Sequence, residues 1–261
     1  MTAAPILDES PALLTRTGRV ATITLNRPQA FNALDMAMAR RLAELGRQVA
    51  DDDDASVLVI RGSGPGFCSG GDIGLFADNL DAIGDAVGAL LDAYHPFLIL
   101  LGEMPKLVLS SVHGAAAGAG LSLALMGDLC IAGEGARFRA SYAGLGVSPD
   151  GGGTVGLVDA VGARAAMRIF LGEDQLDARQ ALAAGLVDRL VPDAHLDAAT
   201  AEWAAQIAEI EPIAIAATKA LVRRRAGGDV SAQLDAEKQA LIRCMETETF
   251  RERVLAFLRG E

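Results

Sequence analysis

The sequence predicts an α/β fold, because strand and helix patterns alternate along a chain rich in apolar residues. Hydrophobic residues make up 51% of the 261 positions, enough to form a large core and to exclude extensive disorder. Val57–Ile60 is a continuous apolar run, and Leu107–Val112 repeats the pattern, which is typical of strands buried on both faces of a sheet. A helical pattern precedes the first run and another separates the two, which is the order of an α/β protein.

An earlier strand is predicted over Arg19–Leu25, where β-branched and small residues alternate before the turn signature Asn26-Arg27-Pro28. A helix should follow, capped by Asn32 or Asp35. Its apolar residues recur at helical spacing, at Met38, Leu42, Leu45 and Val49.

The middle of the chain combines a loop, two helices and a further strand. Arg61–Ile73 is too rich in Gly and Pro for regular structure, so we expect a loop. Ile83–Leu101 is long and apolar and should be helical, and Ala115–Met126 is predicted as a buried helix after a glycine-rich turn. A strand around Cys130–Ala132 then repeats the β-α-β order.

The last quarter is predicted to be all-helical, which divides the chain into a core of residues 1–195 and a helical region of residues 196–261. Two apolar stripes exceed what a small appendage can bury alone, so they should pack in an oligomer interface. The first stripe comprises Leu196, Ala199, Trp203, Ile207 and Ile210, and the second comprises Leu234, Leu241, Cys244 and Met245.

Charge and composition exclude several classes of partner. With 23 basic and 34 acidic residues the net charge is −11, and no basic cluster offsets it, so nucleic acid is not expected as a partner. The uncharged stretch Leu107–Gly127 contains many Gly, Ser and His residues and is interpreted as a buried segment, not a membrane span. The start of the chain has no signal-peptide pattern and the three cysteines lie far apart, so we expect a cytoplasmic protein. The three histidines are equally scattered, and no metal site is expected.

Two glycine-dense junctions each follow a buried strand, at Gly62–Asp72 and at Gly114–Gly120. Ligands bind at strand ends in α/β sheets, and glycine lets backbone N–H groups approach them closely. If the N–H groups of Ser69 and Ala119 point at one carbonyl oxygen, they form an oxyanion hole. The alternative is that these glycines only permit tight turns and helix packing.

Other motifs compete with this interpretation. Gly151–Gly156 matches the dinucleotide pattern GxGxxG, but it follows Ser148-Pro149-Asp150 and not a buried strand. Gly66–Gly70 has the spacing of a nucleophile elbow, and Gly120–Ala124 nearly has its serine form. A hydrolase would also need a histidine base, and only His195, in a polar stretch, follows in the required order.

Asp150 is the candidate acid/base. Locally it could serve in a turn or as a helix cap. Its neighbours Val147 and Val155 are apolar, and three glycines leave room for a ligand. A carboxylate in such a pocket has a raised pKa and can take and return a proton.

Four segments together resemble the crotonase, or enoyl-CoA hydratase/isomerase, family, and the resemblance covers nearly the whole chain. They are NRPQAFNAL (26–34), GFCSGGDI (66–73), VHGAAAGAGLSLALMGDLCIAGEGARF (112–138) and LGVSPDGGGT (145–154). The resemblance implies a spiral of ββα turns with a C-terminal helical region used to form trimers, or dimers of trimers. It also implies that Ser69 and Ala119 donate the oxyanion-hole N–H groups.

The resemblance favours an isomerase over a hydratase. Hydratases of the family hold water between two glutamates, and their positions are occupied here by Ser122 and Tyr142. Isomerases of the family place one acid at the position of Asp150. Moving a double bond needs one carboxylate, whereas hydration needs an acid and a base acting on water.

The resemblance further implies an acyl-CoA thioester as substrate, with coenzyme A entering as part of it and no other cofactor. Arg27 is expected to contact phosphate. The other expected binding residues are Gln29, Ala30, Phe31, Gly70, Gly71, Asp72, Ile73, Gly118, Ser122 and Tyr142.

Three alternatives remain open at this point. A hydratase could use another carboxylate, such as Asp72 or Glu103, if it approached the pocket. Asp150 could attack as a nucleophile in acyl-CoA hydrolysis or dehalogenation. The chain could also be a catalytically silent acyl-CoA-binding homologue.

Overall fold

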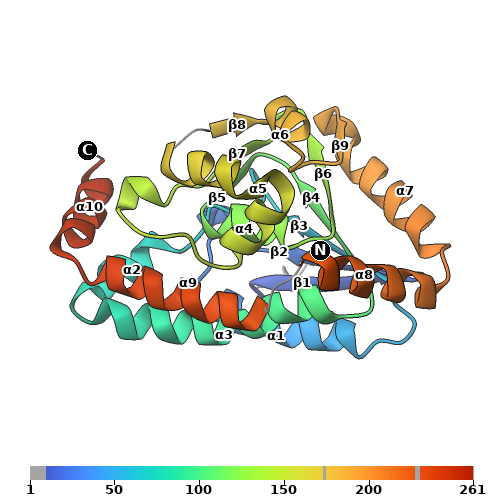
Figure 1. Cartoon of the computed structure of the whole chain (residues 1–261), viewed down its shortest axis with the longest axis horizontal. Coiled ribbons are helices and arrows are strands. Elements are labelled where there is room, and N and C mark those ends of the chain that lie inside the picture. The colour runs from blue at the N-terminus through green and yellow to red at the C-terminus, as the bar shows by residue number, and fades with distance from the viewer. Residues whose placement is uncertain (1–9, 173–174, 227–229, 261) are drawn as a thin grey trace, which may run out of the picture.

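The computed structural model describes residues 10–172, 175–226 and 230–260, and its centre is a six-stranded sheet (Figure 1). The strand order is β1-β2-β3-β4-β6-β9, with β1 antiparallel to β2 and all other neighbours parallel. The α/β prediction is therefore confirmed. The strands are β1 Ala12–Thr17, β2 Val20–Leu25, β3 Val57–Gly62, β4 Leu107–Val112, β6 Leu129–Gly133 and β9 Arg189–Val191.

The strands β2, β3, β4 and β6 lie where their apolar runs predict them. The edge strand β1 was not anticipated, because only the first half of its sequence ALLTRT is apolar and its second half is polar and exposed. It pairs with β2 in a hairpin that runs from Ala12 opposite Leu25 to Thr17 opposite Val20. Gly18 turns the hairpin with φ of 58°, a conformation that favours glycine.

A second, three-stranded sheet corrects one prediction. It has the order β5-β7-β8, formed by Ala115–Ala117, Arg137–Arg139 and Gln175–Asp177. The predicted helix Ala115–Met126 is thus only partly right, since its first residues form β5 and the helix α4 is restricted to Ala119–Leu125. Gly118, with φ of 52° and ψ of −127°, separates the two elements.

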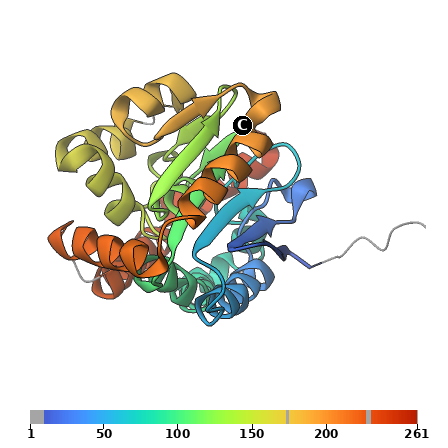
Figure 2. The same ribbon diagram turned by 90° about the vertical axis from the view of Figure 1, so that its right-hand side faces the viewer.

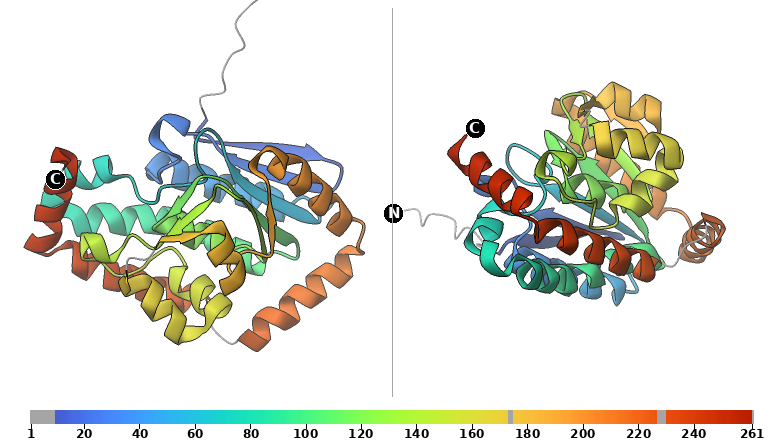
Figure 3. Two further views of the ribbon diagram at one scale, coloured as in Figure 1. Left: turned by 90° about the horizontal axis from the view of Figure 1, so that it is seen from above. Right: turned by 60° about the vertical axis from the view of Figure 1, so that its left-hand side comes forward.

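One face of the large sheet is covered by α1 Met36–Ala50, on which α3 Ile83–Glu103 packs, and α9 Val230–Met245 packs in turn on α3. Asp35 caps α1 by accepting the Met38 N–H at 2.8 Å, as the sequence suggested. In Figure 3 α9 lies along α3. Among the described residues, Leu80–Glu103 is long and apolar enough to cross a membrane by length and composition. It is a core helix here, because α3 packs between α1 and α9.

The opposite face of the sheet carries α7, Leu196–Ala208, which crosses it in Figure 2. Leu196, Trp203 and Ile207 are buried there against residues of β3, β4 and β6. The second predicted stripe is also covered within the chain, since Leu241 and Met245 pack against α3 and against two shorter helices, α2 (Ile73–Asp78) and α10 (Glu248–Arg259). Most residues of the two stripes are therefore buried within the chain and give no evidence for an oligomer interface. The argument that these stripes need a partner subunit to cover them was wrong. The division at residue 195 remains a prediction.

Shorter elements complete the chain. The α-helices are α2 Ile73–Asp78, α5 Gly153–Gly172, α6 Ala178–Ala184, α8 Pro212–Ala226 and α10 Glu248–Arg259. The 3₁₀ helices are η1 Pro28–Ala30, η2 Leu80–Ala82, η3 Ala143–Leu145 and η4 Asp193–His195.

Candidate active site

The two glycine-rich junctions join into one backbone unit. Cys68 forms a bridge with Ala116: the Cys68 N–H donates to the Ala115 carbonyl at 3.1 Å, and the Ala117 N–H donates to the Cys68 carbonyl at 3.0 Å. A Cβ on Gly120 would lie 2.2 Å from the Cys68 oxygen, so only glycine permits this approach. The two junctions therefore lie side by side in the structure, while the convergence of their N–H groups on one oxygen remains a prediction.

The expectation that Ser69 donates one of the two N–H groups needs correction. The Ser69 N–H donates to the Phe31 carbonyl at 3.0 Å and is occupied by that bond. Gly71, two residues on, is placed differently. Leu34 pairs with the residues on either side of it, because the Leu34 N–H donates to Gly70 and the Leu34 carbonyl accepts from Asp72. This pairing leaves the Gly71 N–H unused.

Gly71 and Ala119 line a small cavity of about 20 Å³, together with Asp150 and Tyr94. Ala119 is the first residue of α4, whose first internal bond runs from the Ser122 N–H to the Gly118 carbonyl, so the helix itself does not use the Ala119 N–H. The remaining wall is apolar and comes mainly from α2, α3 and α9, through Leu34, Phe76, Val87, Leu90, Leu91 and Leu241.

Asp150 is 9% exposed, and the apolar residues that line the cavity with it come from other parts of the chain and do not include Val147 or Val155. Burial raises the pKa of its carboxyl to about 6, against a smaller opposing effect of the hydrogen bond from Tyr142. The Tyr142 hydroxyl donates to Oδ1 of Asp150 at 2.8 Å. Ser122 Oγ lies 2.8 Å from the same hydroxyl, so Ser122, Tyr142 and Asp150 form one hydrogen-bonded chain.

Glu237, on α9, is a buried carboxylate that sequence reasoning missed. It is 3% exposed and accepts the N–H groups of Gly152 at 2.7 Å and Thr154 at 2.9 Å, as well as the Thr154 hydroxyl. Burial raises its pKa to about 7, although these three hydrogen bonds act in the opposite direction. The N–H groups at the start of α5 thus have acceptors. Glu237 accepts those of Gly152 and Thr154, and the backbone carbonyl of Asp150 accepts that of Gly153. No local signal could have revealed Glu237, because its partners lie more than 80 positions earlier in the chain.

The expected coenzyme A segment lies beside this unit. The Arg27 guanidinium donates to the Ala33 carbonyl at 2.6 Å and pairs with Asp35 and Asp72, each at 3.1 Å. Its charge is therefore neutralised within the protein, and its contact with phosphate remains a prediction. Phe31 is 53% exposed and has a left-handed backbone with φ of 50°. The other expected binding residues lie in or beside elements already described: Gln29 and Ala30 in η1, Gly70 beside Gly71, Ile73 at the start of α2 and Gly118 before α4.

Other groups considered from the sequence do not take part in the cavity. Cys68 is fully buried, and its thiol S–H donates to the Asn32 carbonyl. Burial raises the pKa of this thiol to about 12, which disfavours a nucleophilic thiolate. Asp72 caps α2 through the Gly74 N–H, and neither it nor Glu103 lines the cavity. No group of three potential metal ligands occurs among the described residues.

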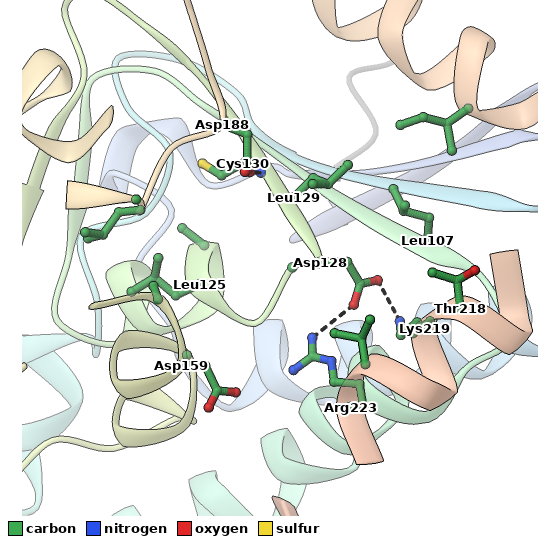
Figure 4. Close-up of a pocket in the computed structure, with 18 of the residues that line it drawn as sticks. Leu107, Leu125, Asp128, Leu129, Cys130, Asp159, Asp188, Thr218, Lys219 and Arg223 are labelled. Atoms are coloured by element: carbon green, nitrogen blue, oxygen red, sulfur yellow. Dashed lines mark hydrogen bonds and ion pairs between the residues drawn. The ribbon is translucent and has the colours of Figure 1, made fainter. Parts of the chain in front are cut away.

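A larger cavity of about 870 Å³ lies elsewhere, between the end of α4, β6 and α8 (Figure 4). Its charged groups are mostly paired with one another: Asp128 forms ion pairs with Lys219 at 2.8 Å and Arg223 at 3.0 Å. Asp150, Gly71 and Ala119 do not line it. The smaller cavity therefore holds the candidate chemistry, despite its size.

Comparison with known proteins gives a consistent result. Residues 15–260 match the family model described as enoyl-CoA hydratase/isomerase. The chain is 35% identical over 242 residues to the 1,2-epoxyphenylacetyl-CoA isomerase of Escherichia coli (strain K12), covering 92% of each. It is 34% identical over 250 residues to the 2,3-dehydroadipyl-CoA hydratase of the same organism, covering 95% of this chain and 96% of that one.

The structure is similar to the crystal structure of an enoyl-CoA hydratase from Mycobacterium avium subsp. paratuberculosis K-10, with a TM-score of 0.84 and 29% identity over 96% of both chains. The fold is therefore the crotonase fold, with ββα units and C-terminal helices. An isomerase and a hydratase match at nearly equal identity, so identity alone does not separate the two activities. The match over most of its length shows that this chain belongs to the enoyl-CoA hydratase/isomerase family.

Proposed function

We propose that the protein is an acyl-CoA isomerase that shifts a double bond, or rearranges a ring, with Asp150 as its single acid/base. One observation carries the proposal: of the described residues that line the cavity with Gly71 and Ala119, Asp150 alone bears a carboxyl group. The resemblance assigns the two hydratase glutamates to the positions of Ser122 and Tyr142, which are neutral here and hydrogen-bonded to each other.

The chemistry follows from this arrangement. The N–H groups of Gly71 and Ala119 hold the thioester oxygen and stabilise the negative charge that develops on it, each contributing about 3 kcal/mol to lowering the barrier. Asp150 removes a proton from C2 to give the enolate and returns it at C4, which completes the shift of the double bond. With a pKa of about 6, Asp150 is mostly ionised at neutral pH and is still a useful acid once protonated.

Binding of the coenzyme A part is proposed along Gln29–Phe31 and Gly70–Ile73, beside the cavity. The protein carries a net charge of −11, so long-range attraction does not assist an anionic ligand. Backbone amides would supply the local contacts, and Arg27 would join them only by exchanging its ion pairs with Asp35 and Asp72 for a phosphate.

Hydratase activity is the second candidate, since the 2,3-dehydroadipyl-CoA hydratase is nearly as similar as the isomerase. The structure offers Glu237 as a second buried carboxylate near Asp150. Its oxygens accept three hydrogen bonds from Gly152 and Thr154, which leaves it poorly placed to hold water. We therefore favour the isomerase.

The test is incubation with 3-enoyl-CoA, 2-enoyl-CoA and arylacetyl-CoA thioesters in D₂O. The proposal expects isomerisation with deuterium incorporation, and loss of both in Asp150→Asn with thioester binding retained. Hydration of 2-enoyl-CoA as fast as isomerisation would establish the hydratase instead. Release of free coenzyme A would point to nucleophilic attack by Asp150, and binding without exchange to a silent homologue.

We further propose a cytoplasmic homo-oligomer, a trimer or a pair of trimers. Support comes from apolar side chains that remain exposed on two of the C-terminal helices. They are Ile213, Leu221 and Val222 on α8, and Phe257 and Leu258 on α10. Light scattering at micromolar concentration tests this, and a monomer would contradict it.

A further inference from the structure

The hydroxyl of Tyr94 is a buried polar group without a hydrogen-bond partner among the described residues. Tyr94 lies on α3, is 2% exposed, and lines the same cavity as Asp150, Gly71 and Ala119. Buried hydroxyls in folded proteins are almost always paired, because leaving one unpaired is unfavourable. An unpaired hydroxyl in the wall of a ligand cavity therefore suggests a partner on the ligand.

The surroundings of Tyr94 offer little else to bond with. Apart from Tyr94 and Asp150, the described residues lining the cavity have apolar side chains or are glycine. Oδ1 of Asp150 already accepts the hydroxyl of Tyr142. Burial raises the pKa of Tyr94 well above its ordinary value, so the group is a neutral hydroxyl at neutral pH.

Tyr94 lies close to the groups proposed to act on the thioester. Its ring atom Cε1 lies 3.6 Å from the position that a Cβ on Gly151 would take, so the ring is next to the turn that carries Asp150. The same position lies 3.8 Å from Cβ of Ala119, one of the two proposed thioester donors. Tyr94 is therefore close to the reacting end of the proposed thioester, where the acyl group begins.

We infer that Tyr94 is a specificity-determining residue whose hydroxyl donates a hydrogen bond to an oxygen on the acyl group of the substrate. The inference rests on the proposed acyl-CoA function and narrows it to thioesters whose acyl group carries a hydroxyl, ether, epoxide or carbonyl oxygen close to the reacting carbons. A purely hydrocarbon acyl group would leave the Tyr94 hydroxyl unpaired and would bind less well.

The test compares thioesters matched in shape, using the wild type and Tyr94→Phe. One pair is 3-hydroxybutanoyl-CoA with 3-methylbutanoyl-CoA, and the other is 4-hydroxypentanoyl-CoA with 4-methylpentanoyl-CoA. In at least one pair, Tyr94→Phe should lose about tenfold in affinity for the hydroxylated member relative to its methyl analogue. A ratio that changes by less than about twofold in both pairs overturns the inference.

A matched variant separates this role from a general effect on the site. Ser110→Ala also removes one buried hydroxyl without a hydrogen-bond partner among the described residues, but Ser110 lies on β4 and does not line the cavity, so this change should not alter the preference between members of a pair. Thermal unfolding gives a second measurement. Without ligand, Tyr94→Phe should be at least as stable as the wild type, because the hydroxyl contributes no internal hydrogen bond, and a marked loss of stability would contradict this.

Binding of these saturated thioesters requires no isomerisation. The outcome therefore remains distinct from that of the proposed function. If Asp150→Asn retained full isomerase activity, the assignment of the acid/base would fail, while the comparison of the Tyr94 variants would still give its own answer.

Discussion

The hydroxyl of Tyr142 donates to Oδ1 of Asp150 at 2.8 Å, and Ser122 Oγ lies at the same distance from that hydroxyl. Because Tyr142 has one proton to give, Ser122 is the donor in the second bond when Asp150 is ionised. The two positions assigned to hydratase glutamates thus form a neutral network that ends on the proposed base.

Tyr142→Phe should therefore raise the pKa of Asp150. A hydrogen bond to a charged group contributes about 1.5–3 kcal/mol, so its loss should move the acidic limb of the rate profile upward by about one to two pH units from about 6. The measurement is the pH dependence of deuterium exchange at C2. Ser122→Ala, which acts through Tyr142, should shift it less, and an unchanged midpoint in Tyr142→Phe would contradict the network.

Asp150→Asn should make the fold more stable at high pH. The pKa of Asp150 is raised from 3.8 to about 6 in the folded protein. At pH values between these two, the folded state therefore binds more protons than the unfolded state. The favourable contribution is complete below about pH 4 and is lost as the pH rises through 6. Asparagine does not titrate and has no such loss. The free energy of unfolding of the variant minus that of the wild type should therefore be larger at pH 8 than at pH 4, by up to about 3 kcal/mol. Urea unfolding at both pH values measures this gap, and a gap independent of pH would refute the burial argument.

Glu237→Ala should impair both stability and turnover. It leaves the N–H groups of Gly152 and Thr154 without their acceptor, which costs about 2–4 kcal/mol, and it loosens the turn that holds Asp150. Glu237→Gln keeps one acceptor oxygen and should lie between the alanine variant and the wild type. Asp235→Ala, at an exposed site on the same helix, is the control. Unfolding curves and kcat for isomerisation decide the matter, and equal behaviour of the two alanine variants would show that Glu237 has no positioning role.

Ala119→Pro should remove one of the two N–H groups proposed to hold the thioester oxygen. Ala119 is the first residue of α4, where proline is best tolerated. Deuterium exchange at C2 of a saturated acyl-CoA should fall by about 100-fold, with folding confirmed by circular dichroism. A folded variant that exchanges at the wild-type rate would mean that the carbonyl oxygen binds elsewhere.

The sequence predicts the elements whose signals are local. The runs at Val57–Ile60 and Leu107–Val112 are mostly apolar, and both form central strands that are buried in the structure. Asp150 could be singled out because its apolar and glycine neighbours are adjacent in the chain. The alanine-rich stretch Ala115–Ala117 was misassigned as helix, since its strand conformation depends on pairing with Arg137–Arg139, which no local pattern reveals.

The details of the site depend on contacts between distant residues. Two distant residues decide which N–H group of the glycine-rich loop remains unused. Leu34 forms backbone hydrogen bonds with the residues on either side of Gly71, and the Phe31 carbonyl accepts the N–H of Ser69. Glu237 lies even farther along the chain from the turn it supports. Sequence patterns could therefore locate the loops of the site, but not the individual N–H group or the buried carboxylate.

The close approach of Gly120 to Cys68 divides the site into parts that can change independently. The two proposed N–H donors belong to main chain that is held by main chain, so side-chain replacement on the surrounding helices leaves them in place. The apolar walls of the cavity are instead mainly side chains of α2, α3 and α9. A library of substitutions on those three helices can thus search for new acyl groups while the thioester-activating element stays constant, which makes this protein a practical starting point for engineering substrate range.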